Sequence, residues 1–167
     1  MIWGVSNSVV CPGVCGKPGM SSSGHFSKQF DAHRLERRLN AVIAADTAAI
    51  ALFTEQVMGL LRAQGAAGEN DFNIELALRE ALANAVLHGC KSDPTKRVEC
   101  TVASEEGGGV LIIVRDPGSG FDPLSVASPL VGENILAAHG RGIFLINMLM
   151  DEVRWERGGT EIHLRKR

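Results

Sequence analysis

The spacing of apolar and polar residues changes several times along the chain, and each spacing predicts an element. Residues 35–43 alternate with a period of two, which favours a strand. The next stretch repeats its apolar positions every three to four residues, as a helix does. These positions are Ile50, Phe53, Val57, Leu60 and Leu61. Asp46 or Thr47 can cap this helix by accepting a hydrogen bond from a free backbone N–H.

A second helical period covers residues 71–88. Its apolar stripe is Ile74, Leu78, Ala81 and Ala85. Asn70 or Asp71 stands where an N-cap is needed, and Gly89 suits the left-handed position that ends many helices. The pattern therefore predicts a helix with one buried face.

Two β-rich runs follow, at residues 97–103 and 110–115. The charged, glycine-rich residues 105–109 join them, which is typical of a hairpin. Residues 116–140 show no sustained period and form a long loop, and loops of that length inside a compact domain are usually functional.

The C-terminal part predicts a third helix at residues 142–150 and two closing strands, at 152–157 and 160–165, that meet at a Gly158-Gly159 turn. The order is strand, two helices, two strands, loop, helix and two strands. Such an order favours an α+β fold with two layers, a sheet and a helical layer, over a βαβ repeat.

Composition divides the 167 residues into two parts. Residues 1–25 hold five glycines, two prolines and five serines, and cannot bury enough apolar surface to offset the entropy of ordering, so we expect a flexible leader. Residues 26–167 have globular composition and the length of a single domain.

Charge and hydropathy exclude several classes of function. A net charge of −2 gives no basic surface for a polyanion, and only eight aromatic residues are available to stack on bases. Direct binding of nucleic acid is therefore disfavoured. No run approaches the roughly 20 apolar residues of a membrane span, and the N-terminus does not resemble a signal peptide. A cytoplasmic protein is expected, and without a secretion signal its four cysteines, Cys11, Cys15, Cys90 and Cys100, are expected to be reduced thiols. Metal binding by Cys11 and Cys15 is disfavoured, because no second Cys/His pair stands at zinc-finger spacing.

Three segments carry candidate chemistry, and the first is on the second predicted helix. Glu80, Asn84 and His88 are four residues apart and so share one polar stripe. The stripe is either a solvated helix face or a site where Asn84 ligates a hard cation such as Mg²⁺ and Glu80 takes a proton from a nucleophile.

The second segment, Asp-Pro-Gly-Ser-Gly, comes directly after an apolar strand and begins at Asp116. It is either a plain turn or a place where a flat ligand lies on bare backbone at Gly118 and Gly120. In the second case, Asp116 can accept a hydrogen bond from an exocyclic amine.

The third segment, Gly140-Arg141-Gly142, opens the third predicted helix. It is either a loop-to-helix junction with an exposed arginine or an anion site, since free N–H groups and the positive end of the helix dipole gather there. Arg141 can add a charge-assisted contact.

The order and spacing of these segments resemble the nucleotide-binding boxes of the GHKL ATPase/kinase superfamily, over roughly residues 30–167. Within it, the runs ELALREALANAVLHG, VRDPGSGFDP and GRGIFLINMLMDEV are similar to those of the anti-sigma factor serine kinases. The resemblance implies the Bergerat fold: a mixed, mainly antiparallel sheet with helices on one face and a flexible ATP lid.

The resemblance also implies residue roles in binding ATP and Mg²⁺. Glu80 is the general base, Asn84 the Mg²⁺ ligand and Asp116 the acceptor for the adenine amino group; His88 receives no role. Four glycines are expected to contact the nucleotide: Gly118, Gly120, Gly140 and Gly142. Arg141 is expected at the phosphates, Thr160 near the adenine, and residues 122–139 as the lid.

The activity implied by the resemblance is transfer of the γ-phosphoryl group of ATP to a serine of an anti-anti-sigma (STAS) partner. The same protein would sequester a sigma factor and form a homodimer. The alternative is an ATP-gated module that holds a regulator without catalysis. A sensor histidine kinase would need phosphoacceptor-histidine helices before this domain, and gyrase-like or chaperone ATPases would need a transducer domain.

Overall fold

The computed structural model of the protein describes residues 35–105, 108–122 and 141–167. The expected leader, Gly140 and nearly all of the expected lid lie outside these residues. None of the helices in the described part of the chain combines the length and apolarity needed to cross a membrane.

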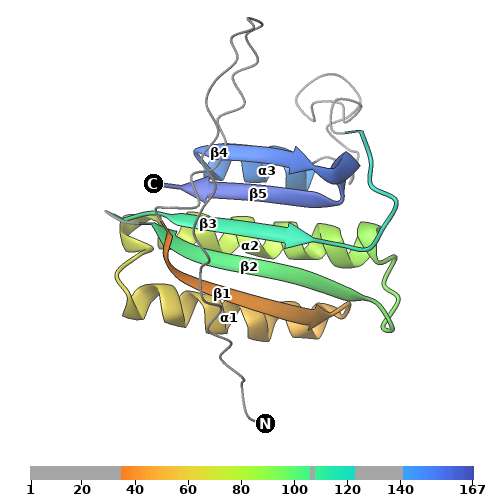
Figure 1. The fold of residues 1–167 in the computed structure, drawn as a ribbon, viewed down its shortest axis with the longest axis horizontal. Helices are drawn as coiled ribbons and strands as arrows, with labels where there is room; N and C mark the ends of the chain where they lie inside the picture. The colour runs from red at the N-terminus through yellow and green to blue at the C-terminus, as the bar shows by residue number, and fades with distance from the viewer. Residues whose placement is uncertain (1–34, 106–107, 123–140) are drawn as a thin grey trace, which may run out of the picture. The chain divides into compact units, whose positions relative to one another are not determined.

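Five strands form one sheet in the order β1-β2-β3-β5-β4, and every described pairing is antiparallel (Figure 1). The strands are β1 (Leu35–Ala44), β2 (Arg97–Glu105), β3 (Val110–Arg115), β4 (Glu152–Glu156) and β5 (Glu161–Lys166). The predicted first strand, hairpin and closing pair are therefore confirmed. β5 lies between β3 and β4, so the chain first forms the edge strand β4 and then returns as β5 to pair with β3.

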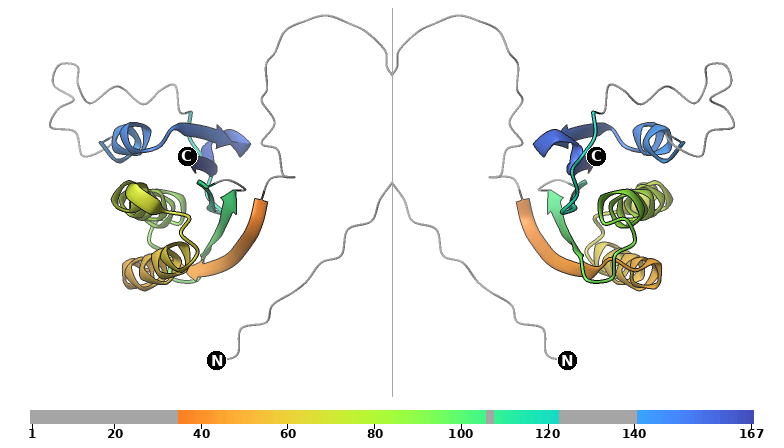
Figure 2. Two further views of the ribbon diagram at one scale, coloured as in Figure 1. Left: turned by 90° about the vertical axis from the view of Figure 1, so that its left-hand side faces the viewer. Right: turned by 90° about the vertical axis from the view of Figure 1, so that its right-hand side faces the viewer.

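The described residues form three α-helices that cover one face of the sheet, and α2 lies between the other two (Figure 2). They are α1 (Thr47–Ala63), α2 (Asp71–Asn84) and α3 (Arg141–Leu149). The two-layer α+β architecture expected from the sequence is confirmed.

The core fills the space between the sheet and the helices. Alternate strand positions point into it, such as Val98, Cys100 and Val102 on β2. The whole apolar stripe predicted for residues 71–88 is buried. On α1, four of the five apolar positions are buried, whereas Leu60 is 47% exposed because it lies about 100° around the helix from the buried Leu61.

Helix ends follow the predictions in part. The Asp46 carboxylate caps α1 by accepting from the Ala48 N–H at 3.1 Å. Asn70 stands at the N-cap position of α2, but its side chain donates to the carbonyl of Arg167 at 2.9 Å and caps nothing.

The second helix does not continue as an α-helix to His88. It changes after Asn84 into a π-helical turn, η3 (Ala85–Gly89). Gly89 is not left-handed either; the positive φ angles follow it, at Lys91 (57°) and Ser92 (55°). The reason for a glycine at position 89 therefore lies in tertiary contacts.

Candidate functional site

Asp116 occupies the end of β3, where the sheet meets the end of the second helix. Its carboxylate accepts a hydrogen bond from the Gly118 N–H at 2.8 Å, and its own N–H donates to the Thr160 carbonyl at 3.0 Å. Burial raises the pKa of this carboxyl, while the Gly118 N–H and the charge of Lys96 oppose the rise. The result is a half-buried, well-oriented acceptor.

Two glycines are packed against that carboxylate. A Cβ on Gly89 would lie 2.1 Å from Asp116 Cγ, and one on Gly118 would lie 2.7 Å from both Asp116 Oδ1 and the Gly89 carbonyl oxygen. Only glycine fits at either position, because real Cβ contacts are longer than 3.0 Å. The π turn thus brings bare backbone to Asp116, a role for Gly89 that the sequence patterns did not suggest.

The rest of the Asp-Pro-Gly-Ser-Gly segment lies on the turn between the closing strands. Gly120 has φ 73°, and a Cβ there would lie 2.0 Å from the Gly158 carbonyl oxygen and 3.2 Å from the methyl carbon of Thr160. The Phe121 N–H donates to the same Gly158 carbonyl at 3.1 Å. Thr160 therefore lies beside Gly120.

The first and third segments also meet, although about 60 residues separate them in the sequence. A Cβ on Gly142, in the first turn of α3, would lie 2.7 Å from the Glu80 Oε2 atom. The same point lies 3.4 and 3.5 Å from the two side-chain heteroatoms of Asn84. The start of α3 thus faces the carboxylate and amide of α2 across a glycine, while Arg141 is exposed beside it.

Asn84 shows the feature that most directly indicates a ligand. Its Nδ2 atom is buried and has no hydrogen-bond partner among the described residues. Buried polar atoms normally have partners, so an orphan one beside Glu80 and a helix start fits a polar group supplied from outside. The orphan Nδ2 atom donates hydrogen bonds, so its partner would be an acceptor such as a phosphate oxygen. The Asn84 Oδ1 and the Glu80 carboxylate are oxygen ligands that suit Mg²⁺, and the bare glycines suit a nucleotide, so the residues present fit both ATP and Mg²⁺.

His88 does not extend the line of Glu80 and Asn84. The π turn changes the helical phase after residue 84, and His88 is exposed. The structure thus brings the candidate residues together in two groups. Glu80, Asn84 and Gly142 meet where α3 begins beside α2. The second group lies after the end of β3 and consists of Asp116, Gly118, Gly120 and Thr160. Gly140 lies outside the described residues.

Comparison with known proteins gives one family and several relatives. Residues 43–166 match the family model described as the histidine kinase-like ATPase domain. The match covers the described helices and strands β2 to β5, but only the last two residues of β1, and it contains every candidate site residue.

Curated relatives share about a third of their residues with the matched part of the chain. The anti-sigma F factor of Priestia megaterium is 34% identical over 98 residues, 56% of this chain and 67% of the relative. The anti-sigma F factor of Geobacillus stearothermophilus is 35% identical over 98 residues, 56% and 66% of the two chains. The serine-protein kinase RsbW of Bacillus licheniformis is 33% identical over 102 residues, 58% and 63%. The alignments span about two thirds of the relatives' own length.

Proposed function

The chain belongs to the histidine kinase-like ATPase domain family, and from that premise we propose that it is an ATP-dependent protein-serine kinase that acts as an anti-sigma factor. Membership implies that the domain binds ATP. The distant relation to anti-sigma F factors and to a serine-protein kinase supports the finer proposal. The single observation that carries it is the meeting of the Glu80 carboxylate, the orphan amide of Asn84 and the glycine start of α3.

The adenine ring occupies the Asp116 end of the site in this proposal. Asp116 accepts a hydrogen bond from the exocyclic amine, while Gly118 and Gly120 allow a flat ring to approach the backbone. Thr160 lies beside Gly120 at the edge of the same pocket.

The phosphates occupy the α3 end. Free N–H groups at the start of α3, with Gly142 and the Arg141 guanidinium, stabilise their negative charge. Gly140, outside the described residues, is proposed to contribute in the same way. Asn84 is the proposed ligand of Mg²⁺, which when bound supplies neutralisation of the phosphate charge.

The proposed reaction is an in-line phosphoryl transfer. Glu80 accepts the proton of a substrate serine hydroxyl while the serine oxygen forms a bond to the γ-phosphorus of ATP. The bond from the γ-phosphorus to the bridging oxygen breaks, and ADP leaves with that oxygen and its electron pair. The products are phosphoserine, ADP and a protonated Glu80, which then returns its proton to water.

The proposed protein substrate is a STAS-domain anti-anti-sigma partner, and the alternative binding partner is a sigma factor. We further propose that the protein acts in the cytoplasm as a homodimer. These proposals rest on the relatives and on the family resemblance.

Glu80→Gln tests the kinase proposal, with Glu75→Gln as its control because Glu75 lies on the same helix and pairs with Arg62 and Arg79 away from the site. Each variant is incubated with Mg²⁺-ATP and a STAS partner, phosphoserine is measured by mass spectrometry, and ATP affinity by calorimetry. We expect Glu80→Gln to lose about 10²–10⁴-fold in phosphorylation rate with ATP binding kept. Unphosphorylated partner with the wild-type protein, together with normal ATP binding, would instead favour the ATP-gated binding module.

A further inference from the structure

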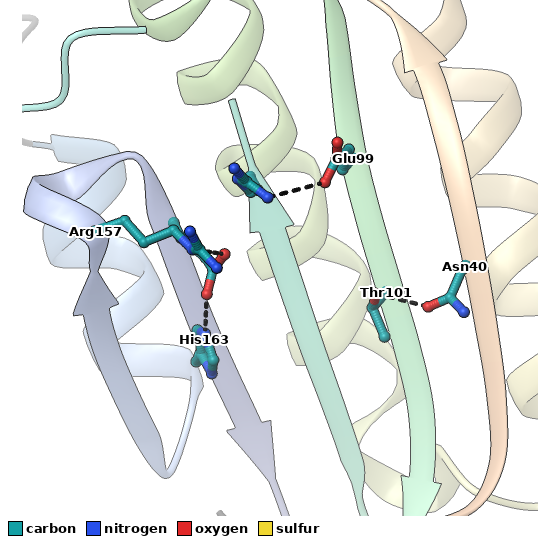
Figure 3. Close-up of polar contacts among 7 residues, drawn as sticks. Asn40, Glu99, Thr101, Arg157 and His163 are labelled. Atoms are coloured by element: carbon teal, nitrogen blue, oxygen red, sulfur yellow. Dashed lines mark hydrogen bonds and ion pairs between the residues drawn. The ribbon is translucent and has the colours of Figure 1, made fainter. Parts of the chain in front are cut away.

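One polar cluster, on the sheet face that carries no helices, reaches the turn beside the nucleotide site. The Glu161 carboxylate accepts from Arg157 Nε at 3.0 Å and lies 2.8 Å from His163 Nε2. Figure 3 shows Arg157 and His163 converging on this carboxylate. The side chains of Glu161 and His163 are each 15% exposed, so solvent screens their contact only in part, whereas the Arg157 side chain is 58% exposed.

Arg157 has an unusual backbone conformation at the start of that turn. Its φ is 51°, a left-handed value that residues other than glycine adopt at a cost. Its carbonyl accepts a hydrogen bond from the Thr160 hydroxyl at 3.1 Å, and its guanidinium is held by Glu161. Two hydrogen bonds therefore hold Arg157 in its left-handed conformation, one at its backbone carbonyl and one at its side chain.

The turn supports the adenine end of the candidate site. The carbonyl of Gly158 accepts from the Phe121 N–H, and Gly120 has no room for a Cβ against that same carbonyl. The Thr160 carbonyl accepts from the Asp116 N–H. A shift of the turn must therefore move the segment that carries Asp116 and Gly120.

We propose that Glu161 is a positioning residue for ATP binding: by holding Arg157 in its left-handed conformation, it keeps the 157–160 turn seated against the Asp116–Phe121 segment. The inference rests on the proposed function, because it assigns the affinity for ATP to this site. Glu161 itself faces away from the helices and the nucleotide site, since Ile162 and Leu164 alternate with it and are buried against the helices.

The test compares three variants by calorimetric titration with Mg²⁺-ATP and by urea unfolding. Glu161→Ala is expected to weaken ATP binding by about tenfold, or about 1.4 kcal/mol. Glu161→Gln keeps an acceptor for Arg157 and is expected to lose about threefold at most. Glu105→Ala is the control, because Glu105 also pairs with an arginine, Arg165 at 2.7 Å, but at the strand end far from the turn. It is expected to bind ATP within twofold of the wild type.

Arg157→Gly separates positioning from a general loss of stability. Glycine adopts φ 51° without strain, so the turn no longer needs the ion pair. In this background, adding Glu161→Ala is expected to change ATP affinity by less than twofold.

The outcomes distinguish this inference from the proposed function. A tenfold loss that persists in the Arg157→Gly background, or wild-type affinity in Glu161→Ala, overturns the positioning role while ATP binding stands. Failure of the wild-type protein to bind ATP would overturn the proposed function itself. If Glu161→Ala does not fold, Arg157→Ala replaces it, because it removes the same ion pair and keeps a non-glycine residue at φ 51°. About tenfold weaker ATP binding in Arg157→Ala than in Arg157→Gly supports the positioning role, and equal binding in the two overturns it.

Discussion

Replacing Gly89 by alanine tests whether the close packing of the π turn against Asp116 determines nucleotide affinity. The new Cβ would lie 2.1 Å from Asp116 Cγ and 2.3 Å from Oδ1, whereas real Cβ contacts begin near 3.0 Å. The backbone at position 89 is not left-handed, so alanine adds no backbone strain there. Any loss of stability or of ATP affinity therefore comes from displacing the Asp116 carboxylate by about 1 Å.

Two effects on the free energy of unfolding oppose each other. Overpacking costs about 1–3 kcal/mol, while replacing glycine by alanine in a helical turn stabilises by about 0.5–1 kcal/mol. We expect a net destabilisation of about 0–2.5 kcal/mol. ATP binding suffers more, because a hydrogen bond to a charged acceptor contributes about 1.5–3 kcal/mol, and its loss corresponds to about 10- to 100-fold in affinity.

The assay is calorimetric titration with Mg²⁺-ATP, paired with urea unfolding. Gly59→Ala is the matched control, because Gly59 lies in the exposed face of α1 with nothing within 4 Å of its Cβ position. It is expected to stabilise by about 0.5–1 kcal/mol and to leave ATP affinity unchanged. Wild-type ATP affinity in Gly89→Ala would refute the assignment of Asp116 as the adenine acceptor.

Three further predictions follow from the site and from the core. Burial raises the pKa of Asp116, so the folded state binds its proton more tightly than the unfolded state and stability falls as pH rises through that pKa. Asp116→Asn is therefore expected to raise the urea midpoint at pH 7 while weakening ATP binding, measured by unfolding and calorimetry. Gly142→Ala places a Cβ 2.7 Å from Glu80 Oε2 and is expected to lower the phosphorylation rate by about 10²-fold, with a smaller effect on ATP affinity; equal effects on both would contradict a base role. Burial raises the pKa of Cys100 to about 12 and that of Cys90 in the same direction, so in a variant whose other two cysteines are serine, Ellman's reagent at pH 8 should label nothing until urea is added.

Much of the fold was predictable because its elements depend on local periodicity. The ten-residue first strand, the hairpin and the buried stripe of α2 each follow from the spacing of apolar side chains, which every element must bury on one face. Leu60 shows the limit, since one residue of helical phase separates a buried position from an exposed one and several phases satisfy the same apolar run.

The site was predictable as three segments, but the contacts among them were not. The motif order indicated Glu80, Asn84 and Asp116, yet nothing in the sequence places Gly142 against Glu80 or Gly89 against Asp116. Those contacts depend on the packing of α3 on α2 and on the strand order that puts β5 next to β3.

Gly89 illustrates the division between sequence and tertiary structure. The sequence by itself determined that a helix should end near this glycine, because a helix end and a glycine are both local features. Only the tertiary structure decided why the residue is glycine: a π turn carries its Cα to a carboxylate 27 positions later, where no Cβ fits. Because this steric requirement arises between segments that are distant along the chain, it cannot be predicted from the local spacing of apolar residues.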